Sequence, residues 1–128
     1  MDKLLIIIDM QNDFIDGALA NPAAQAIVPG IVDFAKNWTG KIGVTYDTHS
    51  ENYLNTQEGK NLPVEHCIKG TQGWELNEKI ANALLDKEVY FAMHMYPNGC
   101  HGLGLAEDRN DVSSWSQQAV LFLKNLGW

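Results

Sequence analysis

The chain has 128 residues, of which 45% are hydrophobic and 20% are charged, and its formal net charge is −7. This composition is typical of one globular domain that is large enough to bury a hydrophobic core. Because lysine and arginine together number only nine, we expect neither nucleic acid nor an anionic membrane as the main partner.

The sequence carries no apolar run that approaches the roughly 20 residues of a membrane-spanning helix. The amino terminus leads at once into a predicted strand, so we do not expect it to be a signal peptide. The two cysteines, Cys67 and Cys100, are too few for a disulfide scaffold. We therefore expect a cytoplasmic protein with reduced thiols.

The first predicted strand covers residues 4–8, LLIII, and is followed directly by Asp9. Five consecutive apolar residues are typical of a strand that is buried on both faces. Ligands of open α/β sheets bind beyond the carboxyl ends of the strands, which makes Asp9 a candidate general base. A strand that simply runs into a polar loop is the alternative interpretation.

A helix and a second strand are predicted next. Apolar residues recur at helical spacing over residues 22–37, and Pro29 predicts that the helix starts late, with the proline in its first turn. Alternating apolar residues predict a strand over residues 41–46, and this strand also ends on an acid, Asp47. Both acids should therefore lie at one edge of the sheet.

Residues 48–70 form a long polar stretch without periodicity, and such loops are usually functional or disordered. The two histidines and Cys67 in this stretch favour function. Thr71 can cap a helix that runs to Asp86, a third strand follows at residues 89–93, and Ser113 opens a last helix. The order β-α-β-loop-α-β predicts a Rossmann-like α/β fold, in which a mostly parallel sheet is flanked by helices joined through right-handed crossovers.

Three side chains in this part of the sequence form a candidate metal site. Asp47 and His49 are two residues apart, so they point the same way in an extended segment, and His66 can complete the set. One carboxylate and two imidazoles suit Zn²⁺, Fe²⁺ or Mn²⁺. The pattern D-x-H also arises by chance and His66 is 17 residues further along the chain, so a chance spacing without a metal is the alternative.

The two cysteines have different predicted roles. Cys67 adjoins His66, but adjacent side chains of an extended chain point apart, so we interpret Cys67 as a small buried residue. Cys100 lies in the Gly-rich stretch NGCHG, where a sharp turn permits an exposed thiolate. Cys100 is therefore a candidate nucleophile, with an ordinary turn cysteine as the alternative.

Three motifs carry a family resemblance: IIDMQNDF at residues 7–14, YDTH at residues 46–49 and HCIKGTQGWEL at residues 66–76. In these motifs and their order, residues 4–91 resemble the isochorismatase-like cysteine hydrolases, the superfamily that includes nicotinamidases and pyrazinamidases. The resemblance implies an enzyme that hydrolyses a small-molecule amide through a cysteine thioester. It implies that Asp9 accepts the thiol proton, that Phe14 lines the substrate pocket, and that a divalent metal is bound by Asp47, His49 and His66.

Residues 92–128 do not resemble the family, and they lack its lysine and its cysteine motif. We expect a single domain over residues 1–128, with a family-like part up to residue 91, a divergent tail, and a fold truncated relative to the family's. Apolar surface left uncovered by so small a sheet predicts a homo-oligomer. A catalytically inactive metal-binding α/β domain, acting in binding or assembly, and a flavodoxin-like nucleotide-binding domain are the alternatives.

Overall fold

The computed structural model describes residues 3–85, 87, 89–90 and 113–127. The chain forms two compact units: residues 1–51 with 64–91, and residues 52–63 with 92–128. The first unit contains the sheet and every candidate site residue except Cys100, which lies outside the described residues.

The first unit is built on a parallel sheet whose strands are β1 (Leu4–Ile7), β2 (Lys41–Val44) and β3 (Val89–Tyr90), in the spatial order β1-β2-β3. Ile7 is paired with Val44, so the chain leaves β1 and β2 at the same edge of the sheet. The predicted parallel α/β fold is confirmed. Asp9 follows β1 and Asp47 follows β2, so both acids lie beyond the same edge of the sheet.

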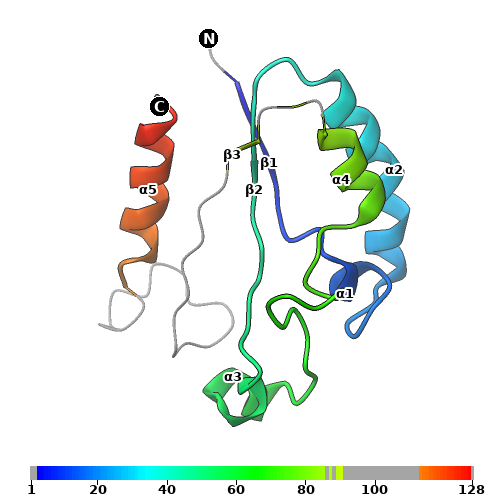
Figure 1. Cartoon of the computed structure of the whole chain (residues 1–128), viewed down its shortest axis with the longest axis vertical. Helices are drawn as coiled ribbons and strands as arrows, with labels where there is room; N and C mark the ends of the chain where they lie inside the picture. Colours follow the sequence, from blue (N-terminus) through cyan, green and yellow to red (C-terminus); the bar gives the residue numbers. More distant parts are fainter. Residues whose placement is uncertain (1–2, 86, 88, 91–112, 128) are drawn as a thin grey trace. The chain divides into compact units, whose positions relative to one another are not determined.

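The helices of the first unit are α1 (Asn12–Ile15), α2 (Pro22–Asn37) and α4 (Glu78–Leu84). Helices α2 and α4 lie side by side on one face of the sheet (Figure 1). Two successive right-handed crossovers in the same direction place both helices there. The core between the helices and the sheet is formed by Ile7, Met10, Ile15, Val28, Ala35, Ile42, Val44, Ile80, Ala83 and Leu84.

The predicted late start of the second element is wrong, because α2 begins at Pro22 and contains Pro29 in its interior. Asn21 caps the helix by accepting a hydrogen bond from the backbone N–H of Ala23 at 2.9 Å, and Pro22 occupies the first turn, where its missing N–H costs nothing. Pro29 removes one backbone hydrogen bond, but the helix continues because Ala35 beyond it is packed into the core.

The predicted cap at Thr71 is also wrong. Helix α4 begins at Glu78, and the side chain of Asn77 caps it by accepting from the backbone N–H of Lys79 at 3.2 Å. The hydroxyl of Thr71 instead donates to the carbonyl oxygen of Ile68 at 2.7 Å. A side chain that closes its own turn in this way competes with its use as a helix cap.

Strands β1 and β2 differ in how deeply their side chains are buried. In β2, Ile42 and Val44 are 1% and 8% exposed, whereas in β1 the exposed fraction rises from 4% at Ile7 to 48% at Ile6. The prediction that the first strand is buried on both faces is therefore wrong. Strand β1 lies at an edge of the described sheet, and α2 and α4 cover only one of its faces.

The second unit contains η1 (Tyr53–Asn55), α3 (Gln57–Asn61) and α5 (Trp115–Asn125). The long polar stretch thus carries two short helices. Thr56 caps α3 by accepting from the N–H of Gly59 at 3.0 Å. Helix α5 begins two residues after the predicted Ser113 start.

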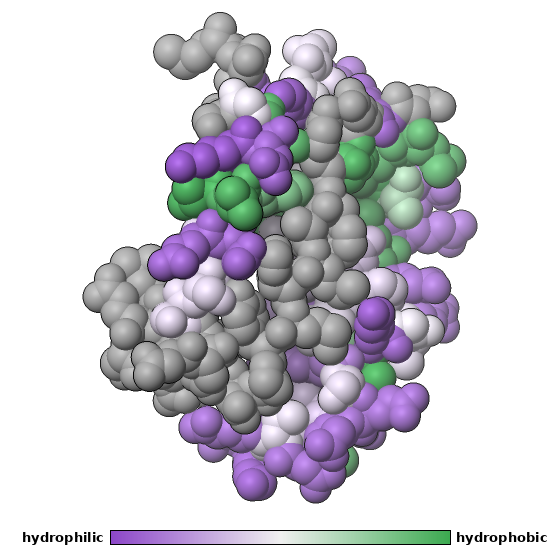
Figure 2. All heavy atoms as spheres, turned by 60° about the vertical axis from the view of Figure 1, so that its left-hand side comes forward, coloured by the Kyte–Doolittle hydropathy of each residue, from purple (hydrophilic) through white to green (hydrophobic). Residues whose placement is uncertain are grey.

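Hydrophilic residues and large hydrophobic residues are both exposed on the described surface (Figure 2). Figure 2 shows many hydrophilic residues on one face, with hydrophobic residues gathered in separate groups in its upper half. Large apolar side chains are exposed in both units, among them Ile8 at 65% and Leu121 at 54%. No helix in the described part of the chain is long and apolar enough to cross a membrane.

Candidate metal centre

Two segments that are distant in the sequence form the candidate centre. Asp47 and His49 follow β2, and His66 lies where the chain returns from the second unit. The segments are joined by backbone hydrogen bonds of 2.9 Å, from the N–H of His49 to the carbonyl of Cys67 and from the N–H of Lys69 to the carbonyl of His49. This short parallel pairing places both imidazoles on the same side of the sheet edge.

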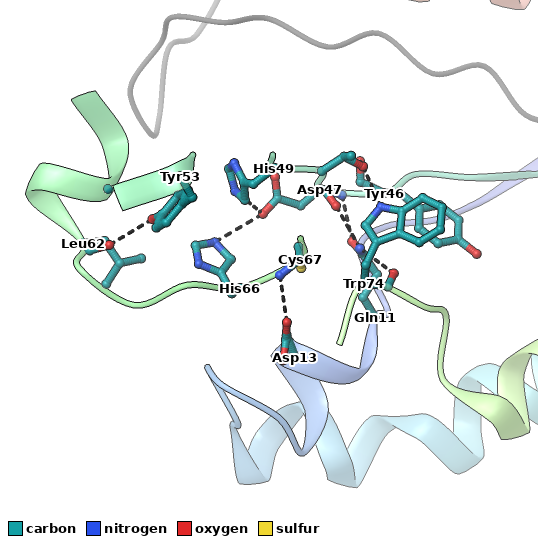
Figure 3. A network of polar contacts seen from close by, with 12 residues as sticks. Gln11, Asp13, Tyr46, Asp47, His49, Tyr53, Leu62, His66, Cys67 and Trp74 are labelled. Carbon is teal, nitrogen blue, oxygen red and sulfur yellow. Dashed lines mark hydrogen bonds and ion pairs between the residues drawn. The ribbon is translucent and has the colours of Figure 1, made fainter. Parts of the chain in front are cut away.

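Both imidazoles point at one carboxylate oxygen (Figure 3). Nε2 of His49 lies 3.0 Å from Oδ2 of Asp47, and Nε2 of His66 lies 3.4 Å from the same atom. One ligand atom from each of the three residues lies within 4.8 Å of the others. The structure therefore brings together the three residues that the sequence grouped as metal ligands.

The hydrogen bonding of His66 leaves the correct nitrogen available for a metal. Its Nδ1 lies 2.7 Å from the carbonyl oxygen of Val64, and a carbonyl only accepts, so Nδ1 carries the proton and donates. In the neutral ring, Nε2 then presents its lone pair toward Asp47. A second hydrogen bond that orients a ligating imidazole in this way is typical of zinc sites. The donor set fits a divalent cation.

The ring of Phe14 packs against His66. The two ring centroids are 5.7 Å apart in an edge-on arrangement, and the His66 side chain is only 3% exposed. Phe14 therefore lies beside the candidate metal ligands, where an aromatic ring is able to border a ligand that they hold.

Asp9 lies just beyond the carboxyl end of β1. The hydroxyl of Thr45 donates to Oδ1 of Asp9 at 2.6 Å and accepts from the Asp9 backbone N–H at 3.1 Å. The φ angle of Asp9 is +48°, a left-handed conformation that non-glycine residues seldom adopt. A strained backbone and a fixed carboxylate oxygen at this edge are features of functional residues.

Cys67 is fully buried, as its sequence context predicted. Burial raises the pKa of its thiol most strongly, and the carboxylates of Asp47, Asp13 and Asp9 raise it further. A raised pKa and a buried sulfur both disfavour the thiolate, which is the nucleophilic form of cysteine.

Sequence reasoning missed Gln11, which is 0% exposed. Its Oε1 accepts from the backbone N–H of Asp47 at 2.7 Å, and its Nε2 donates to the carbonyl oxygens of Asp47 and Trp74, both at 2.8 Å. Glutamine is usually exposed, so nothing in the spacing indicated this role. Only its position in the motif IIDMQNDF indicated that Gln11 has a special role.

Comparison with known proteins identifies one protein family and several similar proteins. The model of the isochorismatase domain matches residues 3–105. A nicotinamidase of Saccharomyces cerevisiae is 30% identical over 118 residues, covering 68% of this chain and 54% of the relative. The chain thus spans about half the length of this curated relative.

Two solved structures are similar to the chain. A pyrazinamidase of Pyrococcus horikoshii in complex with zinc has a TM-score of 0.56 and 27% identity, and the match covers 77% of this chain and 55% of that one. A nicotinamidase of Bacillus subtilis has a TM-score of 0.58 and 28% identity, with coverage of 85% and 66%.

Proposed function

Because the chain belongs to the isochorismatase domain family, we propose that it is a metal-dependent hydrolase of small amides of the nicotinamidase type. The match confirms the family resemblance inferred from the three motifs, and it extends to residue 105, beyond the limit predicted at residue 91. The observation that carries the proposal is the convergence of Asp47, His49 and His66 on one point at the carboxyl end of the sheet. That edge is where open α/β sheets bind their ligands.

The three donors would hold the metal through Oδ2 of Asp47 and the Nε2 atoms of His49 and His66. When bound there, a divalent cation offers an open position to a nitrogen or oxygen atom of the substrate. The zinc complex of the similar Pyrococcus pyrazinamidase supports zinc as the first metal to test, with iron and manganese next. Phe14 would line the pocket, since its ring packs against His66.

In the proposed reaction, Asp9 accepts the proton of a cysteine thiol, and the sulfur forms a bond to the amide carbonyl carbon. The carbon–nitrogen bond breaks as Asp9 returns this proton to the departing nitrogen, which leaves as ammonia. Water then hydrolyses the thioester to give the carboxylic acid and the free thiol. Cys67 does not serve, because it is buried and protonated. Cys100 lies in the Gly-rich stretch NGCHG, where a sharp turn permits an exposed thiolate, and we propose it as the nucleophile.

One observation favours a second candidate function. Cys67, the one cysteine among the described residues, is buried and therefore poorly placed to attack a substrate. A chain that keeps the metal ligands but performs no hydrolysis would act as a metal-binding module in binding or assembly.

Two measurements on the full chain distinguish these functions. We expect stoichiometric zinc, iron or manganese by elemental analysis, and release of ammonia from nicotinamide or pyrazinamide. His66→Ala should lose the metal and the activity, and Cys100→Ser should lose only the activity. Metal without ammonia release supports the binding module, and a wild-type chain that binds none of these metals contradicts both functions.

We also propose that the chain forms a homo-oligomer in the cytoplasm. The exposed apolar residues Ile6 and Ile8 on β1 and its extension support self-association. Sedimentation equilibrium should give a mass above that of one 14.3 kDa chain, and a monomer at every concentration contradicts the proposal.

A further inference from the structure

The carboxylate of Asp13 contacts the backbone beside a proposed metal ligand. We infer that Asp13 is a positioning residue that sets the orientation of His66 through the main chain of Cys67. This inference rests on the proposed metal site, and it assigns to Asp13 a role that neither its spacing nor its charge indicates.

Both carboxylate oxygens of Asp13 have fixed partners. Oδ2 accepts a hydrogen bond from the backbone N–H of Cys67 at 2.7 Å, which is visible in Figure 3. Oδ1 accepts from the backbone N–H of Ala18 at 3.0 Å. Hydrogen bonds from backbone N–H groups to a carboxylate are stronger than those between neutral groups. The carboxylate is therefore held in one orientation, in which Oδ2 accepts from the N–H of Cys67.

The residue that Asp13 holds has a backbone conformation that needs support. Cys67 has a φ angle of +47°, a left-handed conformation that is unfavourable for a non-glycine residue. Such a conformation persists only where surrounding contacts impose it. The N–H of Cys67 is bound by Asp13 and its carbonyl oxygen accepts from the N–H of His49, so contacts on both sides fix this residue.

The direction of His66 depends on this conformation, because His66 precedes Cys67 directly. A different φ at Cys67 would rotate the peptide that joins the two residues, and Nε2 of His66 would move away from Oδ2 of Asp47. Since His49 is bonded to the same Cys67 residue, both imidazoles share one backbone support. Asp13 thus acts on the donor set without touching a metal.

The space around the Asp13 carboxylate is enclosed by two glycines. A Cβ atom at Gly73 would collide with both carboxylate oxygens of Asp13, and a Cβ atom at Gly17 would lie 2.5 Å from Oδ1. An alanine at position 73 is therefore expected to displace the carboxylate from the Cys67 N–H while leaving its charge in the chain. Glycine at these positions permits the close approach.

The test is a Co²⁺ titration of the full chain, followed by the visible absorption of the bound ion. We expect Asp13→Asn to weaken Co²⁺ binding 10- to 100-fold, the usual effect of losing a group that orients a ligand. The visible absorption spectrum of Co²⁺ bound to this variant should also change. Asn has one acceptor oxygen for the N–H groups of Cys67 and Ala18, so the orientation of His66 toward the ion is expected to change. Asp16→Asn, which removes the same charge from an exposed position, is the matched control and should bind within twofold of wild type.

A second variant and a measurement without any variant complete the test. Gly73→Ala should weaken Co²⁺ binding in the same range, and the Cys67 amide of the wild-type chain should be protected from hydrogen exchange. A folded Asp13→Asn chain with wild-type affinity and spectrum overturns the inference, as does a Cys67 amide that exchanges at the rate of a free peptide. A wild-type chain that binds no Co²⁺ contradicts the proposed metal site instead.

Discussion

The side-chain amide of Gln11 pairs with the backbone of Asp47 as a neighbouring strand residue would. It accepts from the Asp47 N–H and donates to the Asp47 carbonyl, with distances of 2.7 and 2.8 Å. At this point the chain has already left β1, so the side chain takes the place of the missing strand pairing. The backbone that carries the first proposed metal ligand is therefore held by a fully buried amide.

Replacement of this amide should affect stability and metal binding together. Gln11→Met keeps the approximate shape but leaves the backbone groups of Asp47 and Trp74 without their partner, at a cost of about 1–3 kcal/mol for each buried group that stays unpaired. We expect a lower free energy of unfolding in urea and Co²⁺ binding weakened 10- to 100-fold. The exposed Gln72→Met is the control, and equal values for both variants would contradict this role.

Asp9→Asn should separate proton transfer from metal binding. Asparagine tolerates the left-handed backbone at this position and can still accept from the Thr45 hydroxyl, so the fold should be kept. It is a far weaker base than a carboxylate. We expect release of ammonia from nicotinamide to fall at least 100-fold while Co²⁺ affinity stays within twofold. Unchanged turnover would remove Asp9 from the proposed reaction.

Burial of the Cys67 thiol predicts a pH dependence of stability. The folded state raises the pKa of this group, so it retains a proton that the unfolded chain loses above about pH 8.5. The stabilisation is complete below that pH and declines as the pH rises further. We expect the urea concentration at the unfolding midpoint to decrease as the pH is raised from about 8 to 9.5. This range lies below the ordinary pKa of tyrosine, so tyrosine does not titrate in it.

The matched variant for this pH effect is Cys67→Ala, which should show a flatter profile over the same range. Both proteins are compared with a chelator present, so that metal loss does not contribute. Native Cys67 should also resist iodoacetamide until the chain is unfolded. Rapid modification of Cys67 in the folded protein would show that its thiol is accessible and ionised.

Ile80 in α4 tests the core that supports the site. Its side chain is 0% exposed and belongs to the cluster between the helices and the sheet. Ile80→Ala should lower the free energy of unfolding by about 2–5 kcal/mol, because it removes buried methyl groups and leaves a cavity. The exposed neighbour Lys79→Ala should change stability by less than about 0.5 kcal/mol in the same urea titration.

The sequence was informative where the signal is local. The order β-α-β-loop-α-β predicted the parallel sheet, and the acids that follow the first two strands were therefore expected at one edge, where the structure ends both strands. The spacing of Asp47 and His49 predicted that both side chains point the same way, and the structure directs Nε2 of His49 at the carboxylate. These features follow from strand periodicity and from the common direction of parallel strands.

The sequence was less informative where distant parts of the chain decide. The side chain of Gln11 is hydrogen-bonded to the backbone of Asp47, and the side chain of Asp13 to the backbone of Cys67. No spacing rule predicts a hydrogen bond between a side chain and a remote backbone group. The course of α2 through Pro29 depends on packing against the core, which outweighs the local effect of a proline. The exposure of Ile6 depends on which elements cover the sheet.

The backbone pairing between His49 and Ile68 has a consequence for how this architecture can diverge. The intervening residues 52–63 belong to the other unit, and both ends of that excursion are already closed by the pairing. Doubling the length of a flexible loop costs only about 0.6 kcal/mol in closure entropy. Insertions or grafted peptides that lie in this excursion but outside η1 and α3 are therefore tolerable without altering the coordinating groups, so these positions are where the protein can be diversified.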